Sequence, residues 1–233
     1  MRHAVRGHRR RGVTAAALAA FLLAACSSTS PKPSPTTTAV TTVPGPTTTT
    51  LPGSSPGEVE GPEGVPIPGA PLLAGVDTAQ YPQTIDGIQC NTSEQLVYHI
   101  HAHLTIFVNG AAQQIPYGIG IAPPLETAPF NGANFVDGGV CFYWLHTHAS
   151  DGIIHIESPT QTIYTLGQFF DVWGQPLTSG QVGPAKGQLT MFVDGQPYTG
   201  DPRAIQLTAH NQIQLDVGTP APLQTLITFP SGL

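Results

Sequence analysis

The chain has 233 residues, of which only 9% are charged, and its formal net charge is −6. Five of its eight basic residues lie in the first 25 positions, so the remainder carries three basic residues against 14 acidic ones. Such a surface repels phosphate backbones and attracts cations, which argues against nucleic acid as a partner.

Residues 1–25 have the pattern of an export signal peptide. Arginines at positions 2, 6, 9, 10 and 11 precede an apolar run over 13–25 that is too short to span a bilayer comfortably. The tetrad Leu23-Ala24-Ala25-Cys26 resembles the lipobox of bacterial lipoproteins, which implies cleavage before Cys26 and lipidation of its sulfur. The alternative is an ordinary secretory peptide with an incidental cysteine. The sequence therefore predicts an exported protein, anchored by lipid to the outer face of the cytoplasmic membrane or to the cell envelope.

Two regions follow the predicted signal peptide. Residues 26–71 are dominated by Ser, Thr, Pro and Gly and offer little to a hydrophobic core, so we expect a disordered, partly polyproline tether. Residues 72–233 have the length of one ordinary domain.

The pattern of this domain is mostly β. Asn109-Gly110 and Asp194-Gly195 are strong hairpin-turn signals. One short helix is expected over 166–173, with Thr165 as its N-cap and Gln168 at the reciprocal position. With one helix, the expected fold is mainly β, a single β-sandwich or barrel-like domain. The predicted strands cover residues 96–108, 140–147, 153–157, 189–193, 204–207, 212–217 and 225–229.

Two cysteines remain if Cys26 is lipidated. In an exported protein, Cys90 and Cys141 are expected to form a disulfide bond. Two free thiols or two metal ligands are the alternatives. Each cysteine shortly precedes a group of histidines, so the bond would hold the two histidine-bearing segments side by side.

The first histidine group alternates along one predicted strand. His99, His101 and His103 are spaced two residues apart, so they share one face of the strand. The intervening residues 100, 102 and 104 are apolar and form the opposite, core-facing side. Because the three imidazoles extend over roughly 13 Å, one ion is not expected to bind all three. Either one or two of them join the second histidine group and the rest orient a ligand or face solvent, or two adjacent ions are bound.

The second group surrounds a predicted hairpin. Asp151-Gly152 suits a two-residue turn, and that register places His148 opposite His155 and His146 opposite Glu157. A shift of one residue would place histidines opposite isoleucines instead.

Imidazole is the commonest metal ligand, so we expect a transition-metal site. Met191 is the only methionine beyond Met1, and the cysteines are expected to be oxidised, which disfavours Cu(I). A calcium site would need more carboxylates. Zn²⁺ and Cu²⁺ fit best, followed by Fe or Mn if Glu157 is a ligand. A pH-sensitive or structural histidine network and a metal-free catalytic histidine are the alternatives. The candidate ligands are His99, His101, His103, His146, His148, His155 and Glu157.

Four motifs resemble a family of uncharacterised exported bacterial proteins with a histidine-rich β-domain. They are His-Ile-His-Ala-His at 99–103, Tyr-Trp-Leu-His-Thr-His at 143–148, His-Ile-Glu-Ser-Pro at 155–159 and Thr-Leu-Gly-Gln-Phe-Phe-Asp-Val-Trp-Gly at 165–174. The resemblance implies export and implies no particular activity.

The function expected from the sequence is that of a lipid-anchored metal-binding protein that sequesters, senses or delivers Zn²⁺ or Cu²⁺. A metal-dependent enzyme, hydrolytic, hydrating or oxygen-using, would instead keep an open coordination position. A structural envelope protein is the third alternative. The isolated His210 is expected to be a turn or surface residue.

Overall fold

The computed structural model describes residues 57–233. The predicted signal peptide, the lipidation of Cys26 and most of the predicted tether lie outside the described residues. Over 57–233, no helix has both the length and the apolar character needed to cross a membrane.

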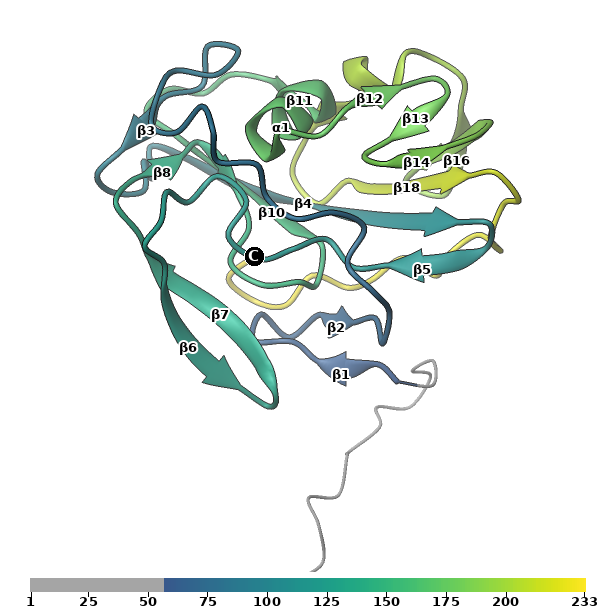
Figure 1. Cartoon of the computed structure of the whole chain (residues 1–233), viewed down its shortest axis with the longest axis horizontal. Coiled ribbons are helices and arrows are strands. Elements are labelled where there is room, and N and C mark those ends of the chain that lie inside the picture. The colour runs from purple at the N-terminus through teal and green to yellow at the C-terminus, as the bar shows by residue number, and fades with distance from the viewer. Residues whose placement is uncertain (1–56) are drawn as a thin grey trace, which may run out of the picture. The chain divides into compact units, whose positions relative to one another are not determined.

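The described residues are mainly β, as predicted, and form a sandwich-like arrangement of several sheets around one α-helix (Figure 1). The elements are β1 (Val59–Glu60), β2 (Pro66–Ile67), β3 (Cys90–Asn91), β4 (Tyr98–Val108), β5 (Ala111–Gln113), β6 (Glu126–Phe130), β7 (Ala133–Gly138), β8 (Phe142–Tyr143), β9 (Leu145–His146), β10 (Ile153–Ser158), β11 (Tyr164–Thr165), α1 (Leu166–Trp173), β12 (Leu177–Thr178), β13 (Gln181–Val182), β14 (Ala185–Lys186), β15 (Leu189–Val193), β16 (Gln196–Tyr198), the 3₁₀ helix η1 (Pro202–Ala204), β17 (Gln206–Leu207) and β18 (Gln212–Val217).

The largest sheet has the strand order β16-β15-β18-β4-β10-β9, and β5 also pairs with β4. β4 is its central strand. Its first half pairs antiparallel with β10, and its second half pairs parallel with β18. Figure 1 shows β4 running through the middle of the described region, with β10 and β18 beside it. The histidines of β4 therefore lie in the interior of the sheet, not at its edge.

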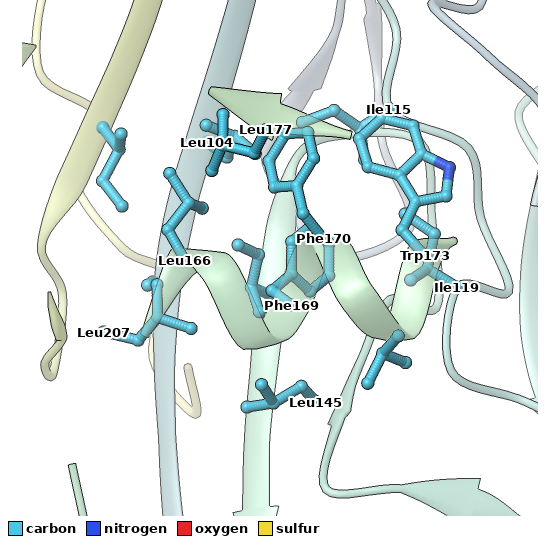
Figure 2. Packing of buried hydrophobic residues seen from close by; sticks show 14 of the residues in the cluster. Leu104, Ile115, Ile119, Leu145, Leu166, Phe169, Phe170, Trp173, Leu177 and Leu207 are labelled. Carbon is cyan, nitrogen blue, oxygen red and sulfur yellow. The ribbon is translucent and has the colours of Figure 1, made fainter. Parts of the chain in front are cut away.

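One face of β4 packs against α1 and carries the main core. Leu104 is buried there with Phe169, Phe170 and Trp173 of the helix (Figure 2), and Ile106 belongs to the same cluster. Because side chains alternate along a strand, the odd-numbered residues of β4, including all three histidines, occupy the opposite face.

Local sequence signals explain why α1 begins and ends where it does. The side-chain oxygen of Thr165 accepts from the Gln168 backbone N–H, and the Gln168 side chain accepts from the Thr165 backbone N–H. Gly174 ends the helix in the left-handed conformation. The predicted bounds of the helix are confirmed.

Strong local patterns also predicted several strands and turns. β4, β15 and β18 are confirmed within two residues. Asn109 and Gly110 both have positive φ and join β4 to β5, as expected for a two-residue hairpin turn.

The predicted tether extends too far along the chain. Its described part, residues 57–71, contains the hairpin β1–β2, which pairs Val59 with Ile67. Val65 and Ile67 are buried. The turn between β1 and β2 is joined to the rest of the domain by Glu63, whose Oε1 lies 2.6 Å from Nε2 of His155.

The strand predicted over 225–229 is wrong, since this described segment has irregular backbone. Side chains of β18 replace the backbone ladder. The Gln212 amide donates to Ile227 O and accepts from Ile227 N, while Gln214 Oε1 accepts from Gln224 N. The two glutamine side chains therefore bond to backbone N–H and C=O groups of residues 224 and 227, groups that would pair with another backbone if this segment were a strand.

The predicted disulfide is present. Cys90 and Cys141 are bonded, with their Cα atoms 5.4 Å apart. Beside the bond, β3 pairs with β8 and places Cys90 opposite Tyr143. The segment that precedes β4 is thereby held against the segment that precedes β9.

Candidate metal centre

Pairing of β4 with β10 places four of the predicted site residues together. His155 lies opposite His101, and Glu157 lies opposite His99. Cross-strand neighbours have Cβ atoms about 4.5–5.5 Å apart, so these side chains can share one ion. Because they lie on the face that is not covered by α1, they are separate from the main hydrophobic core.

The register of β9 on β10 differs from the predicted one by two residues. His146 lies opposite His155, not opposite Glu157. The predicted two-residue turn is wrong because Thr147 already pairs elsewhere: its N–H donates to Ile119 O and its hydroxyl donates to Pro116 O. The chain therefore turns over a longer loop. A shift of two residues keeps every side chain on its face, so the histidines remain together.

Four donor atoms form a closed ring across β4 and β10. Nε2 of His99 and Nε2 of His101 lie 3.2 Å apart, and Nε2 of His101 lies 3.1 Å from Nδ1 of His155. Oε1 of Glu157 completes the ring, at 3.3 Å from Nδ1 of His155 and 3.1 Å from Nε2 of His99. Ligand atoms around a tetrahedral ion with bonds of about 2.0–2.1 Å lie about 3.3 Å apart. The ring therefore has the dimensions of a four-ligand metal site.

A second group of donors comes from β9 and the loop after it. Nε2 of His146 and Nε2 of His148 lie 3.1 Å apart. Their Nδ1 atoms donate to backbone carbonyls, His146 to Tyr143 O at 2.9 Å and His148 to Val136 O at 2.5 Å. Those bonds direct the Nε2 lone pairs toward one another. Backbone carbonyls commonly orient metal-binding histidines in this way.

Burial sets the protonation of these imidazoles. Burial, together with His155 and His99, lowers the pKa of His101 to about 3. Burial and the neighbouring histidines hold the pKa of His146 well below its ordinary value. Both side chains are therefore neutral near pH 7, which is the form that binds metal.

His155 behaves differently. Burial alone would lower its pKa, but hydrogen bonds to Glu157 and Glu63 outweigh that effect and raise the pKa to about 9. Without a metal ion, His155 is therefore a cation held between two carboxylates. The positive charge of this imidazolium therefore lies beside the position where a metal ion would bind.

Two acidic residues of the site did not stand out in the sequence. Oε1 of Glu63 lies 2.6 Å from Nε2 of His155 and is buried, and Oε1 of Glu94 lies 3.4 Å from Nε2 of His148. Glu63 belongs to the segment expected to be a tether, in which no local pattern indicates a ligand. Glu94 lies four residues after Cys90, and the predicted disulfide was the one signal for its proximity.

His103 lies outside both donor groups. Its Nε2 donates to Asp151 O at 2.9 Å, and burial lowers its pKa to about 4. The residue opposite it on β10 is Ile153, which offers no ligand. His210 is exposed and stacks on Phe229, in agreement with a surface role.

Beyond His103, a cavity of about 580 Å³ opens over the same face of β4. His103 and Asp151 line it, and none of the donors of either group does. The lining of the cavity is therefore distinct from the donor groups. His99, which is exposed, forms the solvent-facing edge of the first group.

The structure thus brings together six of the seven predicted ligands as two overlapping groups that could hold a metal ion. The first consists of His99, His101, His155 and Glu157, and the second of His146, His148, His155 and Glu157. Within each group the donor atoms lie within 4.8 Å of one another. Apart from His99, these residues are buried.

Comparison with protein-family models, with curated proteins and with solved structures gives no match for this chain. The resemblance to a family of exported bacterial proteins stays a prediction from the motifs.

Proposed function

We propose that this protein binds a transition-metal ion at the cell envelope, to which it is anchored by lipid. The observation that carries the proposal is the closed ring formed by His99, His101, His155 and Glu157. Its neighbouring donor atoms lie 3.1–3.3 Å apart. Two nitrogen lone pairs at this distance repel one another unless a proton or a metal ion lies between them.

The donor set favours Zn²⁺, with Cu²⁺ as the second choice. Three imidazole nitrogens and one carboxylate oxygen are borderline ligands, which suit Zn²⁺ and Cu²⁺ better than Ca²⁺ or Cu(I). Neighbouring donors in the ring lie near the distance of about 3.3 Å expected between ligand atoms of a four-coordinate Zn²⁺. Neither group includes a sulfur ligand, because Cys90 and Cys141 are bonded to each other.

Four protein ligands leave no coordination position for a substrate at the first group, so this ion is held rather than used in catalysis. Exposed His99 provides an edge through which the ion enters and leaves. These features support storage, sensing or delivery of the ion. Export is supported by the apolar leader, the lipobox-like tetrad and a disulfide bond of the kind that persists in oxidising compartments.

Elemental analysis of the full-length protein, exported by its host and purified without an affinity tag, tests the proposal. We expect at least one Zn²⁺ or Cu²⁺ per chain, and loss of that ion in the His99→Ala/His101→Ala variant. His210→Ala is the matched control, because it removes an imidazole outside both groups. A native protein without metal, whose melting temperature is also unchanged by added Zn²⁺ or Cu²⁺, would show that the proposal is wrong.

A further inference from the structure

Glu157 is shared by the two donor groups, and its two oxygens face different histidines. Oε1 lies 3.1 Å from Nε2 of His99 and 3.3 Å from Nδ1 of His155. Oε2 lies 3.9 Å from Nε2 of His146. One carboxylate thus faces the first group with one oxygen and the second group with the other.

We propose that the site holds two metal ions bridged by the Glu157 carboxylate. The first ion occupies the ring of the proposed function, on which this inference rests. The second is bound by Nε2 of His146, Nε2 of His148 and Oε2 of Glu157. Bridging carboxylates of this kind occur in two-metal sites with ions about 3.5–4 Å apart.

The orientations of His146 and His148 favour a cation at this second position. Each imidazole donates its Nδ1 proton to a backbone carbonyl. The Nδ1 bonds leave both Nε2 atoms facing one another, 3.1 Å apart, where a proton or a metal ion must lie between them. A metal ion between them converts the repulsion of their lone pairs into two coordinate bonds.

Glu157 Oε2 has the environment of an unused ligand atom. It is buried and has no hydrogen-bond partner within residues 57–233. Unpaired buried carboxylate oxygens are costly, and such atoms call for a ligand. Two bonds of about 2.1 Å span up to about 4.2 Å, so one ion can join this oxygen to His146 Nε2 across 3.9 Å.

The second ion has an incomplete set of protein ligands. Its fourth position faces Glu94, whose Oε1 lies 3.4 Å from His148 Nε2 and whose side chain is one-third exposed. Glu94 can bind the ion or give way to water or another small ligand. The two ions therefore differ: the first is enclosed by four protein ligands, whereas the second exchanges ligands with solvent.

Titration of the metal-free, full-length protein with Cu²⁺, followed by electron paramagnetic resonance, tests the inference. Ions about 3.5–4 Å apart couple magnetically. We expect the signal of an isolated Cu²⁺ to grow up to one equivalent, and to fall at least two-fold as the second equivalent binds. Both the titration and the resonance spectrum are recorded on the native protein, so the result does not depend on whether a variant folds.

The variants assign the ions to their groups. His146→Ala/His148→Ala should bind one Cu²⁺ with an undiminished isolated-ion signal, and His210→Ala should behave as the native protein. One ion per native chain, or two ions whose signals simply add, would overturn the bridged pair and leave the proposed function intact. No bound ion at all would overturn both.

Discussion

Glu157 and Glu63 contact the same imidazole from opposite sides. Oε1 of Glu157 lies 3.3 Å from Nδ1 of His155, and Oε1 of Glu63 lies 2.6 Å from Nε2 of the same ring. Glu63 lies between β1 and β2, so the N-terminal hairpin contributes directly to the electrostatics of the site on β10. In the metal-free site, one protonated histidine therefore lies between two carboxylates.

Metal uptake should release the proton of His155. Because its pKa is about 9 without metal, each unit of pH below 9 should weaken apparent metal affinity about tenfold, and the affinity should level off above pH 9. Calorimetric Zn²⁺ titrations in buffers of different ionisation enthalpy measure the released proton. Glu63→Gln removes one of the two stabilising carboxylates and should move the plateau to lower pH. An affinity that is constant between pH 6 and pH 9 would contradict this assignment.

Acid should destabilise the protein partly through His103. Its pKa is about 4 in the folded protein and about 6.5 when unfolded. Between these values the unfolded chain binds more protons, so the stability contributed by neutral His103 is complete above pH 6.5, falls as the pH drops from 6.5 to 4 and levels off below 4. The loss from this one residue approaches about 3 kcal/mol.

The His103→Gln variant isolates that contribution. Glutamine can still donate to the Asp151 carbonyl but does not titrate. Urea unfolding in the presence of a chelator, at pH 7 and pH 4.5, should show a smaller loss of stability in the variant than in the native protein. Equal losses would mean that His103 has no part in the acid sensitivity.

The Cys90–Cys141 bond should stabilise the fold without being a metal ligand. It links residues 51 positions apart, for which chain entropy predicts about 4 kcal/mol of stabilisation. Cys90→Ser/Cys141→Ser should lower the free energy of unfolding by about that amount, measured by urea denaturation. If the folded variant retained less than one metal ion at saturation, a direct role of sulfur would have to be considered.

Gly152 should not tolerate a side chain. Its φ is +88°, and a Cβ would collide with the carbonyl oxygen of Leu104. Gly132 has nearly the same φ, +86°, but open space around it. Gly132→Ala is therefore the control for backbone strain alone, with an expected cost of about 1–2 kcal/mol.

Gly152→Ala should cost clearly more than this control and should also weaken metal binding, because the loop containing it joins β9 to β10. Thermal unfolding and Zn²⁺ titration of both variants check the prediction. Similar stability of the two alanine variants would show that the loop around Gly152 moves to accept the Cβ with no loss in the free energy of unfolding.

Local sequence determined the elements that depend on neighbours in the chain. The capping pair Thr165 and Gln168 set the start of α1, and Asn109-Gly110 set the turn after β4. The two-residue spacing of His99 and His101 was enough to place them on one face, because alternation is a property of the strand itself.

Tertiary structure alone decided which of these side chains meet. Thr147 pairs with residues near position 119 and thereby shifts His146 by two positions relative to β10. His103 has the same spacing as its neighbours, yet it lies opposite Ile153 and donates to a backbone carbonyl instead. Glu63 and Glu94 reach the histidines from segments that no local pattern connects to them. The alternation of side chains along a strand is a property of that strand alone. The register between paired strands, and hence which side chains meet, depends on packing between segments far apart in the sequence.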